Sequence, residues 1–408
     1  MTPFLQLALI LSIIISAAKL GGYLSYRLGQ PAVLGELLVG LLLGPSALNL
    51  VHLPYFSDTH LPEVIYEMAE IGVLLLMFLA GLDLHFSDLL HSSKVAMLAG
   101  SLGVLFPLLL GTGAGLFFPM SLQSAIYIGL ILAATSVSIS AQTLMELKVI
   151  RSRVGIGLLG AAVFDDILAL LGLSIFTALM QPEAGAGLWS VLAAALQMAF
   201  FLGIASLIGW WVFPRLIHRL ANSPISQGVI AFVFVIILLY GWLAEVVGQM
   251  AAITGAFLAG LWLGHTSERE RIHSGMGVIA YGIFVPVFFI NIGLSTDARQ
   301  ISGETGWLMI VMLIVAVISK VLGAGWGARL GGLAPREALQ LGVGMISRGE
   351  VGLIVAAVGM EQGLIQQSTF SAVVGIVILT TLLTPLWLRA LFPKSQAHRN
   401  QKSESAGV

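Results

Sequence analysis

The sequence predicts an all-α polytopic membrane protein, and its composition, the length of its apolar segments and an internal repeat support this fold class. Hydrophobic residues make up 58% of the 408 residues, and charged residues only 10%. A chain of this size with so few charges cannot cover a soluble globule with polar surface, so most of it has to lie in lipid. The 47 glycines, well above the average share of about 7%, suit close helix packing in lipid.

Thirteen apolar segments of membrane-spanning length follow one another along the chain. Their limits are 4–26, 31–48, 65–84, 94–118, 123–145, 153–180, 187–213, 224–246, 248–264, 276–295, 306–329, 337–360 and 366–391. The first lacks the charged start and the cleavage site of a signal peptide, so we expect it to be retained. Residues 1–392 are predicted to form one membrane unit with short loops, and the polar tail at 393–408 is predicted to be disordered.

Basic residues are distributed asymmetrically between the two sets of alternating loops. Of the 19 Lys and Arg residues, only Arg299 lies in one set. The other set and the tail hold Arg27, Lys94, Lys148, Arg151, Arg153, Arg215, Arg219, Arg269, Arg271, Arg329, Arg336, Arg389, Lys394, Arg399 and Lys402. The positive-inside rule then predicts an external N-terminus and a cytoplasmic C-terminus in the inner membrane of a prokaryote. The net charge of −1 and the scattered basic residues argue against a nucleic-acid partner.

Two pairs of segments repeat along the chain at a similar spacing. VLGELLVGLLLG at 33–44 resembles ITGAFLAGLWLG at 253–264, and FLAGLDL at 78–84 more weakly resembles FINIGLS at 289–295. The copies lie seven positions apart in the order of the segments (second and ninth, third and tenth), and because seven is odd, they enter the membrane from opposite sides. Such inverted repeats are typical of secondary transporters, which alternate between two open states.

The fifth and twelfth segments carry polar or glycine-rich interruptions, AATSVSISAQT at 133–143 and GVGMISRGEVG at 342–352. We expect both helices to break there, with the exposed backbone buried in protein or lining a cavity. Positive helix ends would then need an acid and negative ends a base, and Glu350 and Arg348 are well placed for these roles. The alternative is a continuous helix in which hydroxyls bond their own backbone.

Further charged residues lie deep within apolar segments. Asp165 and Asp166 are adjacent in segment 153–180, and Lys320 lies in segment 306–329. Charges at this depth cost several kcal/mol on insertion scales, which favours a functional role over chance. Neighbouring helical residues point about 100° apart, so the two acids are expected to serve different partners. For Lys320, a purely structural anchor is the alternative.

Five stretches together resemble the monovalent cation:proton antiporter-2 family. They are RLGQPAVLGELLVGLLLGPS at 27–46, LLLMFLAGLDL at 74–84, FDDILAL at 164–170, SKVLGAGWGARLGG at 319–332 and SRGEVGL at 347–353. Within this family the Asp-Asp pair resembles sodium/proton antiporters of the NapA and NhaA type. Kef-type potassium systems carry Gln-Asp at this place and usually a large nucleotide-binding domain.

The resemblance implies thirteen transmembrane helices in an NhaA-like antiporter fold with two crossed, broken helices. It implies a homodimer that works by an elevator-type movement. Dimerisation helices are expected at roughly 4–48 and 187–264, and core ion-transport helices at roughly 65–180 and 276–360.

The resemblance also implies roles for individual residues. Asp166 is expected to bind the transported Na⁺ and to carry protons, while Asp165 forms an ion pair with Lys320. Thr135 and Ser136 are expected to line the ion site. For Arg348 and Glu350 we expect a structural ion-pair network near the helix crossing.

These features predict a secondary active transporter that exchanges Na⁺ or Li⁺ for H⁺, without enzymatic activity and without a cofactor. Protons and the cation would compete for Asp166, and release of a second proton from Lys320 would make the exchange electrogenic. A K⁺/H⁺ antiporter could use the same acids. A sodium-coupled symporter of similar fold would need more basic groups than Lys320 and Arg348 supply. Motifs of the common hydrolases are missing from the sequence.

Overall fold

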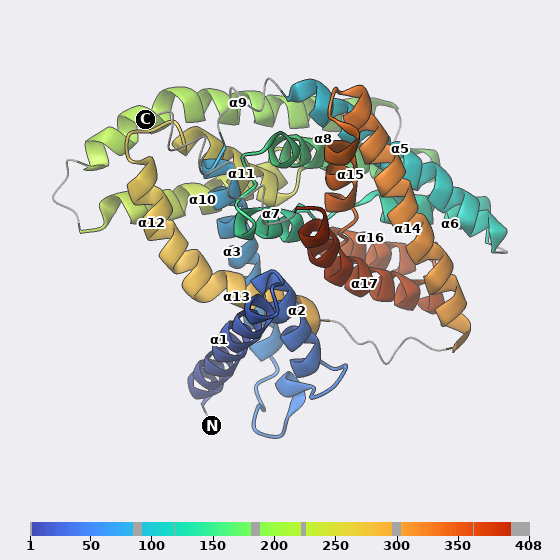
Figure 1. Cartoon of the computed structure of the whole chain (residues 1–408), viewed down its shortest axis with the longest axis horizontal. Helices are drawn as coiled ribbons and strands as arrows, with labels where there is room; N and C mark the ends of the chain where they lie inside the picture. Colours follow the sequence, from blue (N-terminus) through green and yellow to red (C-terminus); the bar gives the residue numbers. More distant parts are fainter. Residues whose placement is uncertain are drawn as a thin grey trace. The chain divides into compact units, whose positions relative to one another are not determined.

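The computed structural model describes residues 2–84, 92–118, 120–180, 188–221, 226–295, 303–361 and 363–392. Every regular element in these ranges is helical, so the predicted all-α class is confirmed (Figure 1). The elements are α1 (Pro3–Arg27), α2 (Ala32–Leu43), η1 (Leu50–His52), α3 (Leu61–Leu82), α5 (Ser93–Phe117), α6 (Leu122–Ala133), α7 (Val137–Glu146), α8 (Arg153–Met180), α9 (Leu188–Ala221), α10 (Gly228–Val246), α11 (Ala252–Leu263), α12 (Arg269–Ile279), η3 (Ala280–Phe284), α13 (Val285–Leu294), α14 (Gly303–Leu330), α15 (Pro335–Gly344), α16 (Glu350–Glu361) and α17 (Gln367–Leu391).

The helices coincide in position with the predicted apolar segments. Within the described residues, 10 helical segments are long and apolar enough to cross a membrane, with α6 and α7 counted as one segment and α12 to α13 as another. The apolar helices α2 and α11 are shorter, and α15 with α16 covers the predicted twelfth segment. The protein is therefore a multi-pass membrane protein, while the number of thirteen crossings stays a prediction.

The chain forms two compact units. Unit 1 contains Met1–Ser16, Val51–His91 and Asp166–Asn291, and unit 2 contains Ala17–Leu50, Ser92–Asp165 and Ile292–Val408. The division runs through α1, α8 and α13, and it places both interrupted segments in unit 2. The predicted division into core and dimerisation helices depends on which helices move and which contact a second copy of the chain. This assignment therefore stays a prediction.

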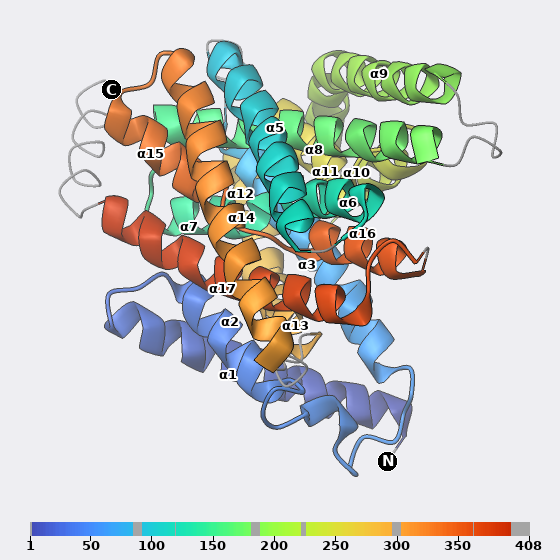
Figure 2. The same ribbon diagram turned by 90° about the vertical axis from the view of Figure 1, so that its right-hand side faces the viewer.

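Unit 2 contains a closely packed helix pair, α5 and α14 (Figure 2). A Cβ on Gly323 would lie 2.3 Å from the carbonyl oxygen of Leu102, and one on Gly327 would lie 2.2 Å from that of Leu98. Only glycine allows this approach of two backbones. The glycines of the SKVLGAGWGARLGG stretch therefore hold α14, which carries Lys320, against α5.

The repeated segments pair reciprocally. In unit 1, a Cβ on Gly260 of α11 would lie 2.0 Å from the carbonyl oxygen of Phe78 in α3, which joins ITGAFLAGLWLG to FLAGLDL. In unit 2, a Cβ on Gly44, which follows α2, would lie 2.3 Å from the carbonyl oxygen of Gly293, which joins VLGELLVGLLLG to FINIGLS. In both pairs, the first segment of one repeat packs on the second segment of the other repeat, as expected for two related halves.

The first turn of α2 is capped by a side chain from α7. The Glu146 carboxylate accepts hydrogen bonds from the backbone N–H groups of Ala32 at 2.5 Å and Val33 at 3.2 Å. Gln142 Nε2 donates to the same carboxylate at 2.8 Å. Because Pro31, the N-cap residue, makes no side-chain cap, Glu146 satisfies two donors that the helix itself leaves unpaired.

We expect Glu146→Ala to lower the thermal unfolding midpoint of the detergent-purified protein. Loss of a capping group costs about 1–2 kcal/mol, and the two N–H groups lose a charged acceptor at the positive end of α2. The control is Glu63→Ala in the first turn of α3, where the side chain is mostly exposed and the expected change is below about 0.5 kcal/mol. Equal destabilisation by the two substitutions would contradict the capping role.

Candidate functional site

The fifth segment is interrupted between α6 and α7. Helix α6 ends at Ala133, α7 begins at Val137, and the backbone at Ala134 and Ser136 is extended. Thr135 and Ser136 are buried within this break. Thr135 Oγ1 donates a hydrogen bond to the Ala133 carbonyl oxygen at 3.4 Å. The predicted break is present, and the alternative of a continuous helix is wrong here.

The twelfth segment is interrupted between Gly344 and Glu350, and its break contacts the first one. The Ser136 N–H donates to the Ser347 carbonyl oxygen at 2.9 Å. A Cβ on Gly349 would lie 2.6 Å from the Ser136 Cβ, so glycine allows this close approach. The side chain of Glu350 lies outside the described residues, and its predicted role stays a prediction.

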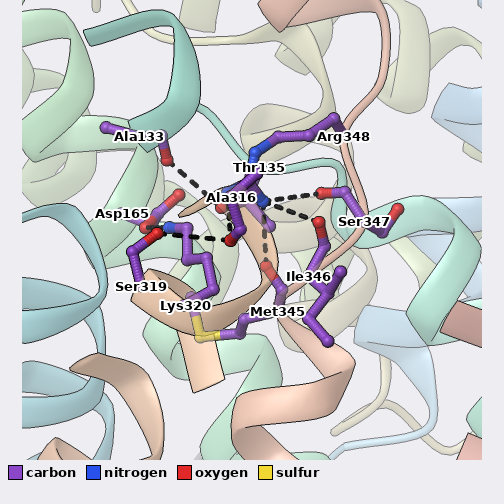
Figure 3. Close-up of polar contacts among 10 residues, drawn as sticks. All are labelled: Ala133, Thr135, Asp165, Ala316, Ser319, Lys320, Met345, Ile346, Ser347 and Arg348. Atoms are coloured by element: carbon purple, nitrogen blue, oxygen red, sulfur yellow. Dashed lines mark hydrogen bonds and ion pairs between the residues drawn. The ribbon is translucent and has the colours of Figure 1, made fainter. Parts of the chain in front are cut away.

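Arg348 is 1% exposed, and its guanidinium group binds backbone carbonyls (Figure 3). Nη1 donates to Met345 at 3.2 Å, to Ile346 at 2.7 Å and, at the 3.5 Å limit, to Ser347. Nη2 donates to Ala316 of α14 at 3.3 Å. Three of these carbonyls directly follow α15, whose C-terminal end carries a partial negative charge. The base therefore lies at a broken helix end, and the expected ion-pair network with Glu350 stays a prediction.

Lys320 of α14 and Asp165 of α8 form a fully buried ion pair, in which Lys320 Nζ donates to Asp165 Oδ1 (Figure 3). The other carboxylate oxygen, Asp165 Oδ2, has no hydrogen-bond partner among the described residues. A buried ion pair is seldom more stable than apolar packing of the same volume, so its presence favours a functional role. One carboxylate oxygen is left to accept a further donor or a cation.

Asp166 directly follows Asp165 on α8. Its side chain is half-buried, and it belongs to unit 1, whereas Asp165 belongs to unit 2. Consecutive helical residues point about 100° apart, so the two carboxylates have different surroundings. Helix α8 thus presents one acid paired with a lysine and a second acid directed elsewhere.

Sequence reasoning missed three hydroxyl groups that bind the breaks. Thr380 Oγ1 accepts from the Arg348 N–H at 3.2 Å, and Thr381 Oγ1 donates to the Arg348 carbonyl oxygen at 2.8 Å. Ser140 Oγ donates to the Gly344 carbonyl oxygen at 2.5 Å. Hydroxyls in apolar helices often bond their own backbone, so they give little signal. The threonines at 380, 381 and 384 in the last apolar segment give only a weak signal, whereas Ser140 lies in the interruption at 133–143 that the sequence already marks.

The arrangement can bind a hard cation. Hydroxyl groups, carbonyl oxygens freed at helix breaks and carboxylates are the ligands that such cations prefer. Cation and proton both neutralise a carboxylate, so the same group can take either one.

The known proteins that this chain resembles agree with a cation-binding site. A family model described as sodium/hydrogen exchanger, transmembrane, matches residues 13–394. The Na(+)/H(+)-K(+) antiporter GerN of Bacillus cereus is 37% identical over 390 residues, which cover 95% of this chain and 96% of that protein. The Na(+)/H(+) antiporter of Enterococcus hirae is 37% identical over 390 residues, covering 95% of this chain and 99% of that one.

A solved structure shows the same fold. The sodium proton antiporter MjNhaP1 from Methanocaldococcus jannaschii matches with a TM-score of 0.66 at 19% sequence identity. The match covers 95% of this chain and 98% of that chain.

Proposed function

This chain belongs to the sodium/hydrogen exchanger family, and we propose that it exchanges Na⁺ for H⁺ at Asp166 by elevator-type alternating access. Members of this family are multi-pass transporters of monovalent cations and protons and not enzymes. The observation that carries the proposal is the buried Lys320–Asp165 pair, next to Asp166 in the sequence. The free energy needed to bury these two charges in the membrane is explained if the pair takes part in ion exchange.

Competition at one carboxylate is sufficient for exchange. The cation would be held by Asp166 together with oxygens at the break that contains Thr135 and Ser136, because hard cations take several oxygen ligands. Protonation of Asp166 removes the negative charge that the cation needs. Carrying either the cation or the proton across the membrane then couples the two fluxes.

Lys320 would make the exchange electrogenic. Sodium binding would draw the Asp165 carboxylate away from Lys320, and the lysine, buried without its anion, would release its proton. Asp166 would release another. Asp165 Oδ2, which has no partner among the described residues, supports this step because it can accept a new ligand.

The proposal includes thirteen membrane crossings with crossed breaks, an external N-terminus and a cytoplasmic C-terminus in a prokaryotic inner membrane. The basic residues of alternate loops support this orientation. It also includes a homodimer with dimerisation helices at roughly 4–48 and 187–264, core helices at roughly 65–180 and 276–360, and no cofactor besides the transported ions. Both breaks fall within the proposed core.

Potassium exchange is a second candidate for this site. One relative of 37% identity is named as a Na(+)/H(+)-K(+) antiporter, which favours K⁺ as a further substrate here. The same acids would serve both cations, and only the number and spacing of the oxygen ligands would differ.

Purified protein in liposomes with an imposed pH gradient and a trapped pH dye tests the proposal. Addition of Na⁺ or Li⁺ is expected to dissipate the gradient, while protein-free liposomes show no change. A response to K⁺ alone would establish the second candidate instead. No response to any of the three cations would contradict an antiporter.

A further inference from the structure

Both main-chain polar groups of Arg348 are bound by side chains of α17. The Arg348 N–H donates to Thr380 Oγ1 at 3.2 Å, and Thr381 Oγ1 donates to the Arg348 carbonyl oxygen at 2.8 Å. Arg348 lies in the break between α15 and α16, so its backbone is not part of either helix. All three residues are buried, so water cannot replace a lost partner.

Arg348 stands between the two residues that contact the other break. The preceding residue, Ser347, accepts the hydrogen bond from Ser136 N–H at 2.9 Å. The following residue, Gly349, lies against the Ser136 side chain so closely that a Cβ would clash. Two hydroxyl groups of α17 thus hold the residue between the two contacts that position Ser136.

The same anchor fixes the direction of the Arg348 side chain. With its backbone held on α17, the guanidinium group reaches the carbonyls that follow α15 and the Ala316 carbonyl of α14. These bonds keep a buried positive charge on the end of α15. A shift of the Arg348 backbone would therefore move both the charge and the break.

We propose, on the basis of the function proposed above, that Thr380 and Thr381 are positioning residues of the exchange site. Through the main chain of Arg348 they hold Ser136 and its neighbouring carbonyls in the geometry that binds the cation. Neither threonine contacts the cation. A displacement of about 1 Å in such a support is enough to weaken a site that depends on several oxygens.

The two threonines contribute differently. Thr380 Oγ1 also donates to its own helix, at the Ile376 carbonyl oxygen at 2.8 Å. The hydroxyl of Thr381 has one bond among the described residues, and that bond goes to Arg348. Removing it takes away the side-chain donor of a buried carbonyl and changes the shape of α17 little. Thr381 is the position at which the inference is tested most directly.

The test compares Thr381→Val, Thr381→Ser and the control Thr384→Val in proteoliposomes. Thr384 is also buried on α17, but among the described residues its hydroxyl donates only to the Thr380 carbonyl oxygen of its own helix, at 2.7 Å. Initial exchange rates are measured against Na⁺ concentration. We expect Thr381→Val to raise the KM for Na⁺ about tenfold, or ~1.4 kcal/mol, and the other two variants to stay within about twofold of wild type.

A purely structural role would reduce the amount of folded protein and leave the KM unchanged. Such a result for Thr381→Val would overturn the inference, as would an equal rise of KM in Thr384→Val. If Thr381→Val does not fold, the test is whether Na⁺ raises the thermal unfolding midpoint of Thr381→Ser as it does for wild type. Loss of this Na⁺ effect would contradict the inference, because Thr381→Ser keeps the hydroxyl that is proposed to support the site. A wild-type protein without any Na⁺ response would overturn the proposed function itself, whereas a responsive wild type with an unchanged Thr381→Val overturns this inference alone.

Discussion

Replacing Asp166 by asparagine is expected to abolish Na⁺-driven proton movement, with rates at least about a hundredfold below wild type. Asparagine keeps the size of the side chain and one carbonyl oxygen, but it takes up no proton and carries no negative charge. Both cargoes of the proposed exchange therefore lose their binding group at once. The measurement is the recovery of dye fluorescence after Na⁺ addition to proteoliposomes that hold a pH gradient.

The control is Asp58→Asn, the same chemical change in the loop between η1 and α3. Asp58 Oδ1 accepts a hydrogen bond from the His60 N–H at 3.0 Å near the surface, so its charge is already solvated. This variant is expected to retain the wild-type rate within about twofold. Wild-type exchange by Asp166→Asn, at equal amounts of reconstituted protein, would show that another group carries the ions.

The positions of the helices could be predicted because the bilayer sets their length. A segment such as α10 is apolar except for Glu245 near its C-terminal end, and the thickness of the hydrocarbon region sets its length. The breaks could be predicted as well, because residues such as Ser136 and Arg348 interrupt apolar runs that would otherwise continue. The Lys320–Asp165 pair was implied by the family resemblance, whereas the cost of burying a charge predicts only that each of the two residues has some partner.

The contacts between distant segments could not be predicted in this way. Nothing in an apolar helix indicates whether a threonine bonds its own backbone or that of a neighbour, so Thr381 gave no distinct signal. The sequence also gave no sign of the role of Glu146. It is the last residue of α7, as many surface glutamates are at helix ends, but it caps α2, more than a hundred residues away in the chain. These contacts depend on the register between helices, which a single sequence does not show.

Lys320→Ala is expected to have two large effects, one on stability and one on the coupling of exchange to membrane potential. Removing one partner of a buried pair leaves Asp165 as an uncompensated charge, at a cost of about 3–5 kcal/mol. The thermal unfolding midpoint in detergent should therefore fall strongly. Exchange that persists at Asp166 should no longer respond to an imposed membrane potential, because the second proton carrier is gone.

The double variant Lys320→Ala with Asp165→Asn separates these two effects. An amide at position 165 no longer needs an ammonium partner, so the double variant should recover much of the lost stability. It should still exchange ions without responding to membrane potential, because lysine and not the aspartate charge carries the second proton. If the number of protons moved per cation is unchanged in Lys320→Ala, Lys320 is only a structural anchor and the electrogenic step is wrong.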